Sequence, residues 1–346
     1  MIHAKHINPP KPRSIHLSKG GEGGFGFVTH ERQKSPSIPL FQRGRLLEIP
    51  KMGKLTFYIV DVFAEEKYAG NQLAVFRSGN TLADIDMQRI AKEINFSETT
   101  FILSETQREG GFDVRIFTPL REVPFAGHPT LGTAHIIRKE IVPESSGKIV
   151  LNLKVGQIPV TFSDGDGGNS TYWMKQIEPI FGKTLSAEVI APVLNLNVSE
   201  IDDRFPIEEV STGLPHILVP LRRLESLKRA RVVQDKYFQL IENRWAKPIL
   251  IFCPEPHNSR NDISVRMFAD IFGIREDPAT GSGNGCLAGY LVRHRYWGRE
   301  KIDIRSEQGY EIGRPSLLYL RAEETNGKID ISAGGKAITI AKGEFV

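Results

Sequence analysis

Two glycine-containing segments carry residues that could bind an anion or hold a reacting group. They are Gly127-His128-Pro129-Thr130 and Gly281-Ser282-Gly283-Asn284, and each leads into an apolar stretch, Cys286–His294 in the second case, that is predicted to be helical. The first N–H groups of a helix lack intrahelical partners and carry partial positive charge. Both segments therefore predict a site for a small carboxylate or phosphate. The alternative interpretation is a tight turn that only joins two elements.

Three side chains near these segments could take part in proton transfer. Glu98 begins a predicted strand at 97–103; in a closed cleft its pKa would rise, so that it could both take and give a proton, whereas at a sheet edge it would be a solvated surface residue. His128 stands at a predicted helix start, which favours a neutral imidazole at neutral pH. Asp277, one residue before Pro278, either caps a turn, orients a substrate amine or shares a proton with His128.

Further candidates for substrate binding are polar or small residues. Asn71 follows Gly70 in a predicted turn and could bond a ligand carboxylate, although a turn role alone would explain it. Ser282 either adds a hydroxyl to the backbone anion site or caps the helix. The predicted substrate-binding set is Asn71, Gly127, Thr280, Gly281, Ser282 and Gly283.

An internal repeat suggests how these residues are brought together. The tetrapeptide at 114–117, Val-Arg-Ile-Phe, reappears at 265–268 as Val-Arg-Met-Phe, and Arg-Glu-Val-Pro at 121–124 reappears at 275–278 as Arg-Glu-Asp-Pro. The offset of about 150 residues is too long for a solenoid but fits two similar domains. Two such units facing each other would form a cleft with one helix N-terminus on each side.

The motifs carry a family resemblance. Asn-Phe-Ser-Glu-Thr-Thr-Phe (95–101), Glu-Val-Pro-Phe-Ala-Gly-His-Pro-Thr (122–130) and Glu-Asp-Pro-Ala-Thr-Gly-Ser-Gly (276–283) resemble signatures of the phenazine-biosynthesis PhzF-like family. So do Gly-Asn-Gln-Leu-Ala-Val (70–75), Ser-Glu-Gln-Gly (306–309) and Gly-Arg-Pro-Ser (313–316). The resemblance implies the diaminopimelate-epimerase fold: α+β, with two pseudo-symmetric domains, each a curled, mostly antiparallel sheet around a central helix. It also implies a homodimer.

The resemblance further implies the chemistry. Glu98 would shuttle the proton, and His128, Asp277 and Ser282 would belong to the active site. In diaminopimelate epimerase two opposed cysteines act as acid and base, and their places hold Ala126 and Thr280 here, while Cys286 is interpreted as a small core residue. We expect a cofactor-independent isomerase that moves a proton on a small carboxylate-bearing metabolite by means of one carboxylate. The alternative is a non-catalytic protein that binds small acids on the same fold.

The domain boundaries follow from composition and pattern. Residues 1–53 are rich in Pro and Gly without periodicity and are predicted to be a disordered leader, with Met52 as a possible start of the folded protein. We expect an N-terminal domain at 54–165, with the crossing near Gly165–Gly168, and a C-terminal domain at 166–335. The final strand, 336–346, would return to the first domain.

Composition, charge and cysteine content limit the kinds of partner and cofactor that the sequence predicts. The 346 residues are 40% hydrophobic and 25% charged with a net charge of +4, concentrated in the first fifty, so no nucleic-acid footprint is evident. Two cysteines without metal-ligand spacing predict neither a metal site nor a disulfide framework. No apolar run reaches the ~20 residues of a membrane span, and we expect a cytoplasmic protein. The stretch 283–288 fits a loose dinucleotide pattern but lacks an adjoining strand, so no nucleotide cofactor is expected.

Overall fold

The computed structural model describes residues 54–77, 79–145, 147–165 and 170–346. The predicted leader at 1–53, including Met52, and most of the predicted glycine-rich crossing lie outside the described residues. The boundaries at 165/166 and 335/336 stay a prediction. Within the described part, no helix is long and apolar enough to cross a membrane.

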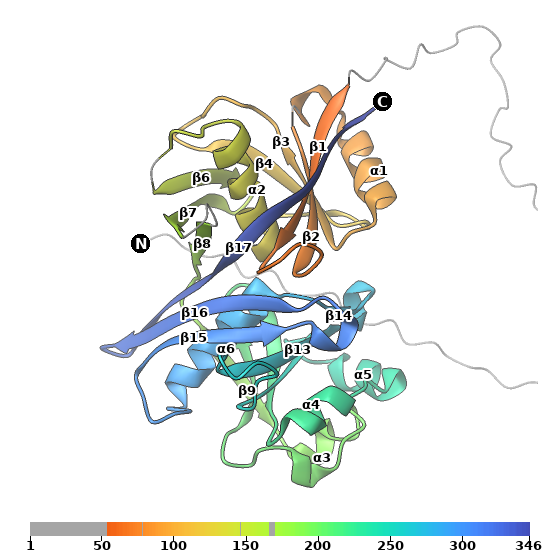
Figure 1. Cartoon of the computed structure of the whole chain (residues 1–346). Coiled ribbons are helices and arrows are strands. Elements are labelled where there is room, and N and C mark those ends of the chain that lie inside the picture. The colour runs from red at the N-terminus through yellow and green to blue at the C-terminus, as the bar shows by residue number, and fades with distance from the viewer. Residues whose placement is uncertain (1–53, 78, 146, 166–169) are drawn as a thin grey trace, which may run out of the picture. The chain divides into compact units, whose positions relative to one another are not determined.

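The first half of the described chain forms a ring of strands around one helix (Figure 1). Its helices are α1 (Asp84–Ile94) and α2 (Gly127–Glu140). Its strands are β1 (Leu55–Val62), β2 (Asn71–Phe76), β3 (Glu98–Ile102), β4 (Phe112–Phe117), β5 (Glu122–Val123), β6 (Lys148–Leu153), β7 (Gly156–Asp164) and β8 (Ser170–Lys175). Neighbours in the ring are β1–β2–β3–β4–β6–β7–β8, and the β2–β3 and β4–β6 pairs are parallel while the others are antiparallel.

The second half repeats this arrangement. Its helices are α3 (Ala187–Ile190), α4 (Leu224–Arg229), α5 (Gln234–Ile241) and α6 (Gly281–Arg293). Its strands are β9 (Ile180–Leu185), β10 (Ile207–Ser211), β11 (Pro215–Pro220), β12 (Ile249–Cys253), β13 (Ile263–Ala269), β14 (Ile274–Asp277), β15 (Lys301–Gln308), β16 (Ser316–Thr325) and β17 (Lys328–Phe345). The order β10–β11–β12–β13–β15–β16–β17 has the same sequence of antiparallel and parallel pairs as the first ring.

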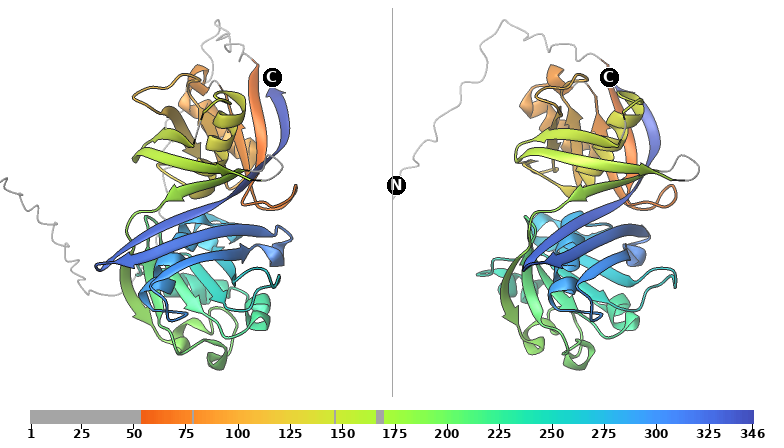
Figure 2. Two further views of the ribbon diagram at one scale, coloured as in Figure 1. Left: turned by 60° about the vertical axis from the view of Figure 1, so that its left-hand side comes forward. Right: turned by 90° about the vertical axis from the view of Figure 1, so that its left-hand side faces the viewer.

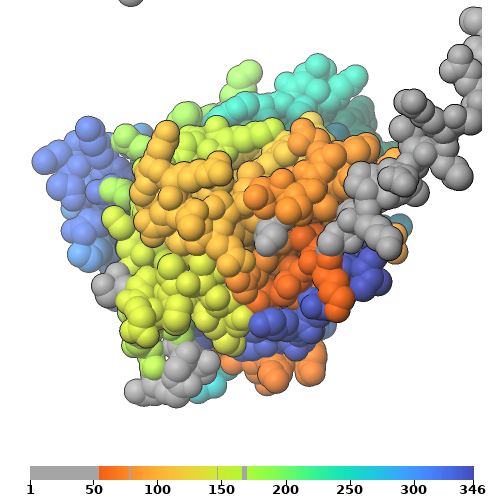
Figure 3. Space-filling view, turned by 90° about the horizontal axis from the view of Figure 1, so that it is seen from above, coloured from red at the N-terminus to blue at the C-terminus, as the bar shows by residue number. Residues whose placement is uncertain are grey.

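Strand β17 belongs to both sheets. Its first part pairs with β16 and β8, and its last part pairs with β1, with Phe345 opposite Leu55 (Figure 2). The ring of the first half is therefore closed by β17, because β8 and β1 flank the same strand. Seen from above, the end of β17 lies beside β1 at the surface of this half (Figure 3).

The two central helices owe their composition to their surroundings. Most residues of α2 and α6 are buried, including Leu131 and Ile137 on α2 and Leu287 and Leu291 on α6. A helix enclosed by a ring of strands buries residues on all its sides, so charged side chains of α2 are confined to its last turn, residues 138–140, and small residues stand where strands approach closely. The α+β class and the two similar halves, each with a curled sheet around a central helix, match the expectation.

Several elements differ from the predicted ones. Helix α6 begins at Gly281, five residues before the expected Cys286, because glycines with helical dihedrals continue the helix into the turn. Strands β8, β9 and β10 were not predicted. Residues of β9 are mostly exposed or half-buried, so hydrophobic alternation is weak there. The expected final strand at 336–346 is the second part of the longer β17, which begins at Lys328 and pairs with β1 at its end.

Candidate functional site

The two helices α2 and α6 begin at matching places. The residues before them, Ala126 and Thr280, have extended backbones, and neither side chain caps its helix in the described structure. Gly127 and Gly281 face each other, because a Cβ added to Gly127 would lie in van der Waals contact with the Gly281 Cα, at 3.4 Å. The first N–H groups of both helices thus gather at one place. This arrangement can bind an anion.

Glu98 lies at the start of β3, next to the first turn of α2. Its Oε2 is 3.6 Å from His128 Nε2, and 17% of its side chain remains exposed. Burial, together with the negative charge of Asp277, raises the pKa of Glu98 to about 8. A carboxyl group with such a pKa can exchange a proton with a bound molecule near neutral pH.

His128 is held as a neutral imidazole. Burial lowers the pKa of His128 to about 3, while a hydrogen bond with the Gln72 backbone acts in the opposite direction. Among the described residues, its Nε2 has no hydrogen-bond partner although it is buried. A buried polar atom without a partner calls for a ligand or water. His128 Nε2 therefore faces Glu98 as a group that a substrate could engage.

Asp277, at the end of β14, is fixed by hydrogen bonds from both halves of the chain. Asn71 Nδ2 donates to Asp277 Oδ1 at 2.9 Å and to the carbonyl of Ala279 at 2.9 Å, and the Thr280 hydroxyl donates to Asp277 Oδ2. Burial raises the pKa of Asp277 to about 6, against the lowering effect of the bonds from Thr280 and Asn71. The predicted alternative that Asp277 caps a turn is thus compatible with its bond to Thr280, and its carboxylate is also part of the buried cluster.

Gln308 was not predicted as a site residue. Its Nε2 donates to the carbonyl of Asp277 at 2.7 Å and to the Thr280 hydroxyl at 3.1 Å, and its Oε1 accepts from Asn284 Nδ2 at 2.9 Å. It thereby fixes the turn between β14 and α6. The signal was present in the Ser306-Glu307-Gln308-Gly309 motif, but sequence spacing alone could not show which strand residue meets that turn.

The remaining predicted residues occupy the first turn of α6. The carbonyl of Ser282 accepts a hydrogen bond from the Thr212 hydroxyl at 3.3 Å. Gly283 packs tightly inward, since a Cβ there would lie 2.9 Å from a Leu250 methyl and 3.3 Å from His216 Nε2. The lack of a side chain at Gly283 therefore serves packing of the helix, whereas Gly281 faces Gly127 and Phe63.

Cys286 lies one turn into α6 and is not poised to react. Its Sγ is 3.7 Å from His216 Nδ1 and 3.6 Å from the Thr212 hydroxyl. Burial raises the pKa of the Cys286 thiol to about 11. Thiolate is the reactive form of cysteine, so this residue stays an inert thiol at neutral pH.

The second half places a proline where the first half has Glu98. Phe117 and Phe268 are equivalent in the internal repeat. Phe117 lies opposite Thr99 in β3, and Phe268 lies opposite Ile249 in β12. Glu98 immediately precedes Thr99 in the chain, and Pro248 immediately precedes Ile249. The two halves therefore present one acid/base side chain at this position rather than two.

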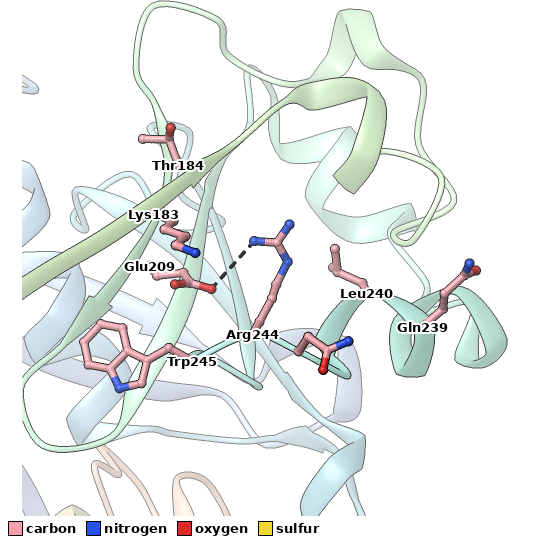
Figure 4. A pocket seen from close by; sticks show the side chains of 8 residues that line it. Lys183, Thr184, Glu209, Gln239, Leu240, Arg244 and Trp245 are labelled. Atoms are coloured by element: carbon pink, nitrogen blue, oxygen red, sulfur yellow. Dashed lines mark ion pairs between the residues drawn. The ribbon is translucent and has the colours of Figure 1, made fainter. Parts of the chain in front are cut away.

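Two surface pockets lie elsewhere. The larger, with a volume of about 560 Å³, is lined by residues of β9, β10, the end of α5 and the segment after it, among them Lys183, Glu209, Arg244 and Trp245 (Figure 4). Arg244 Nη1 and Glu209 Oε1 are 3.7 Å apart in it. The second is lined by residues including Arg108 and Asn152. None of the predicted site residues lines either pocket. Among the described residues, no group of three or more His, Cys, Asp and Glu side chains is arranged to hold a metal.

Comparisons with known proteins agree with this architecture. The family model described as phenazine biosynthesis-like protein (PhzC-PhzF) matches residues 60–343. Trans-2,3-dihydro-3-hydroxyanthranilate isomerase of Pseudomonas aeruginosa is 34% identical over 290 residues, covering 81% of this chain and 96% of that protein. The crystal structure of a PhzF-family phenazine biosynthesis protein from Bacillus anthracis has a TM-score of 0.79 at 25% identity, covering 85% of this chain and 100% of that one.

A more distant neighbour shares the fold alone. A probable proline racemase from Agrobacterium radiobacter has a TM-score of 0.56 at 12% identity, covering 84% of this chain and 93% of that chain.

Proposed function

Because the chain belongs to the phenazine biosynthesis-like (PhzF) family of isomerases, we propose that it moves a proton within a small carboxylate-bearing metabolite, using Glu98 as its one acid/base group and no cofactor. The substrate would bind with its carboxylate at the N-termini of α2 and α6, next to Gly127 and Gly281. Its reacting carbons would face Glu98. Asp277 and His128 would hold its amino or hydroxyl groups.

The observation that carries the proposal is that equivalent positions of the two halves hold different residues, Glu98 in the first and Pro248 in the second. A racemase with two bases needs an acid on one face of the carbon and a base on the other, one from each half. Here a buried carboxyl stands on one side, with a pKa of about 8, and a proline stands at the matching place. One carboxyl group on one face favours removal of a proton from one carbon and its return to another carbon on the same face.

The proton balance of such a step is simple. Ionised Glu98 takes a proton from an activated C–H, the electron pair shifts along a conjugated system, and the protonated Glu98 returns the proton at the far end of that system. The helix N-termini and the neutral His128 stabilise the charge that develops in between. No net oxidation occurs, and the enzyme returns to its starting state.

The relatives and the site support one substrate class. The Pseudomonas aeruginosa relative is named for a cyclic amino- and hydroxy-substituted carboxylic acid. An anion site beside a carboxylate and an imidazole suits molecules of that kind, with Asp277 opposite an amine. Pocket residues outside the motifs would select among such acids, so we propose the class and not the compound.

The test uses deuterated water. Wild-type protein and Glu98→Gln are incubated with trans-2,3-dihydro-3-hydroxyanthranilate and with a panel of cyclic amino and hydroxy acids, and product is followed by NMR. We expect turnover of one class, deuterium at the carbon that receives the proton, and a fall of about 10²–10⁴-fold in Glu98→Gln. Glu93→Gln, on the exposed side of α1, is the matched control and should behave as wild type.

Two results would contradict the proposal. Equal turnover by wild type and Glu98→Gln would remove Glu98 from the reaction. Tight binding of the acids without any turnover or deuterium exchange in wild type would support the alternative of a non-catalytic binding protein.

A further inference from the structure

Arg314 joins the second half of the chain to the segment that precedes Asn71. It follows a short 3₁₀ turn, Tyr310–Ile312, and its side chain crosses to the first half. The guanidinium donates at 2.6–2.9 Å to one carboxylate and three successive carbonyls: Asp61 Oδ1, Tyr68 O, Ala69 O and Gly70 O. The Asp61 side chain is 3% exposed and the Arg314 side chain 20%.

The geometry of residues 68–70 depends on a planar, multidentate cation. Tyr68 and Gly70 have φ values of 69° and 70°, and their carbonyls, with that of Ala69, converge on Arg314. Asp61 Oδ2 accepts from the Tyr68 N–H at 2.7 Å. Guanidinium offers five donors in a fixed fork, whereas an ammonium offers a point charge. Without Arg314 the three carbonyls and the buried carboxylate would lose their shared partner.

The segment clamped in this way leads directly to the candidate site. Asn71, the next residue, donates to Asp277, and the backbone of Gln72 bonds to His128. The orientation of both side chains thus depends on where residues 68–72 lie. The same segment is also tied to the second half by the Gly70 N–H, which donates to the carbonyl of Pro315 at 3.0 Å.

The other end of the Arg314 loop rests on the turn that carries Asp277. The Arg314 N–H donates to the carbonyl of Gly309 at 3.0 Å. Gly309 has a φ of 79°, and a Cβ there would lie 2.6 Å from the carbonyl oxygen of Pro278. The loop 309–314 therefore touches the residue after Asp277 on one side and holds the residue before Asn71 on the other.

We propose that Arg314 is a positioning residue that sets the registry of Asn71 and Gln72 against Asp277 and His128. Its effect on turnover rests on the proposed function, because it acts through residues given roles there. Its effect on the position of residues 68–72 does not depend on the proposed function. Arg314 touches neither the proposed anion site nor Glu98, so it shapes the site without contacting substrate.

The experiment compares Arg314→Ala, Arg314→Lys and a matched control. Arg321→Ala removes an arginine of the same strand–loop region, paired to Asp303 at 3.0 Å on an exposed face. Hydrogen exchange of the full chain reports on the segment directly. We expect exchange of the Tyr68 and Gly70 amides to rise about tenfold or more in Arg314→Ala, as for loss of a charge-assisted hydrogen bond, and to be unchanged in Arg321→Ala.

Activity and titration give independent readouts. In Arg314→Ala we expect kcat to fall by about 10²-fold, as for a displaced reacting group, with a smaller change in KM. The apparent pKa assigned to Asp277 should move upward as its bond from Asn71 weakens. NMR signals of the His128 ring should shift. Arg314→Lys should restore only part of each effect, and added guanidinium ion should restore Arg314→Ala at low millimolar concentration more than ammonium does.

The outcomes separate this inference from the proposed function. If exchange at 68–70, the His128 signals and the pH profile match wild type in Arg314→Ala, the inference is wrong, whatever Glu98 does. If these change as expected while Glu98→Gln retains turnover, Arg314 still positions the segment and the proposed acid/base role fails instead. Should Arg314→Ala not fold, Arg314→Lys and Asp61→Asn, which keep side-chain volume, carry the same test.

Discussion

Asn71 at the start of β2 donates a hydrogen bond of 2.9 Å to Asp277 at the end of β14, 206 residues later in the chain. The bond joins the two halves at the place where both helix N-termini meet. It also ties the charge state of Asp277 to the position of the β1–β2 turn. Residues far apart in sequence therefore set the chemistry of one carboxylate together.

Asn71→Ala should raise the pKa of Asp277 above about 6, because the bond from Asn71 lowers it. The buried carboxylate would lose a donor, at a cost of about 1–3 kcal/mol in the free energy of unfolding. The cost should be larger at pH 7.5 than at about pH 5, where Asp277 is more often protonated. Urea unfolding at both pH values measures this, with the exposed Asn80→Ala as control. A cost independent of pH would show that the bond does not act on the charged form.

The pH dependence of kcat/KM should reveal Glu98. If Glu98 first takes a proton, kcat/KM rises about tenfold per pH unit below about 8, where the ionised form of the free enzyme is scarce. His128 stays neutral over this range, since its pKa is about 3. Initial rates between pH 5.5 and about 9.5 test this. A profile that falls over the same interval would mean that the resting enzyme must carry the proton.

Glu98→Gln should stabilise the fold at high pH. The folded-state pKa of Glu98 is raised from 4.5 to about 8, so ionisation is easier in the unfolded chain. Wild-type stability is then fully present below pH 4.5 and falls as pH rises toward 8. Glu98→Gln has no ionisable group at this position and does not lose this stability. The difference in free energy of unfolding between the variant and wild type should therefore grow, in favour of the variant, over that interval. Chemical denaturation at pH 4.5, 6.5 and 8.5 measures it, and a constant difference would place Glu98 in a solvated environment.

Cys286→Ala should keep activity within severalfold of wild type. The thiol is buried, with a pKa raised to about 11, so thiolate is scarce at neutral pH. Iodoacetamide should accordingly inactivate wild type slowly or not at all. Rapid inactivation that follows modification of Cys286, with loss of turnover in Cys286→Ala, would instead show thiol chemistry in the site.

The internal repeat predicted much of this architecture. The matching Arg115–Glu122 and Arg266–Glu276 ion pairs bridge equivalent hairpins in the two halves, and all four residues belong to the repeated tetrapeptides. The helix starts were recognisable because both repeats place glycine there, and at Gly283 a Cβ would lie only 2.9 Å from a Leu250 methyl. Glu98 was predicted as a site residue from its motif and not from composition, since a lone Glu at a strand start is usually solvated.

Other features depend on tertiary packing that a linear sequence does not display. Gln308 meets the β14–α6 turn only because β15 lies parallel to β13. The role proposed for Arg314 depends on carbonyls from another half of the chain. Strand β9 is mostly exposed or half-buried, so its hydrophobic pattern is faint, and the pairing with β10 that defines it is long-range. Such contacts are set by topology, and periodicity carries no information about them.

Strand β17 has a consequence for the synthesis of the protein. Leu55 pairs with Phe345, so the first ring to leave the ribosome lacks its closing strand until nearly all the chain has emerged. Contacts of such sequence separation slow folding and leave strand edges open meanwhile. The first ring is synthesised first but can close only after β17 has been synthesised. Nascent chains arrested before Lys328 should stay open to proteases across β1 and β8, and those extended through Phe345 should become resistant.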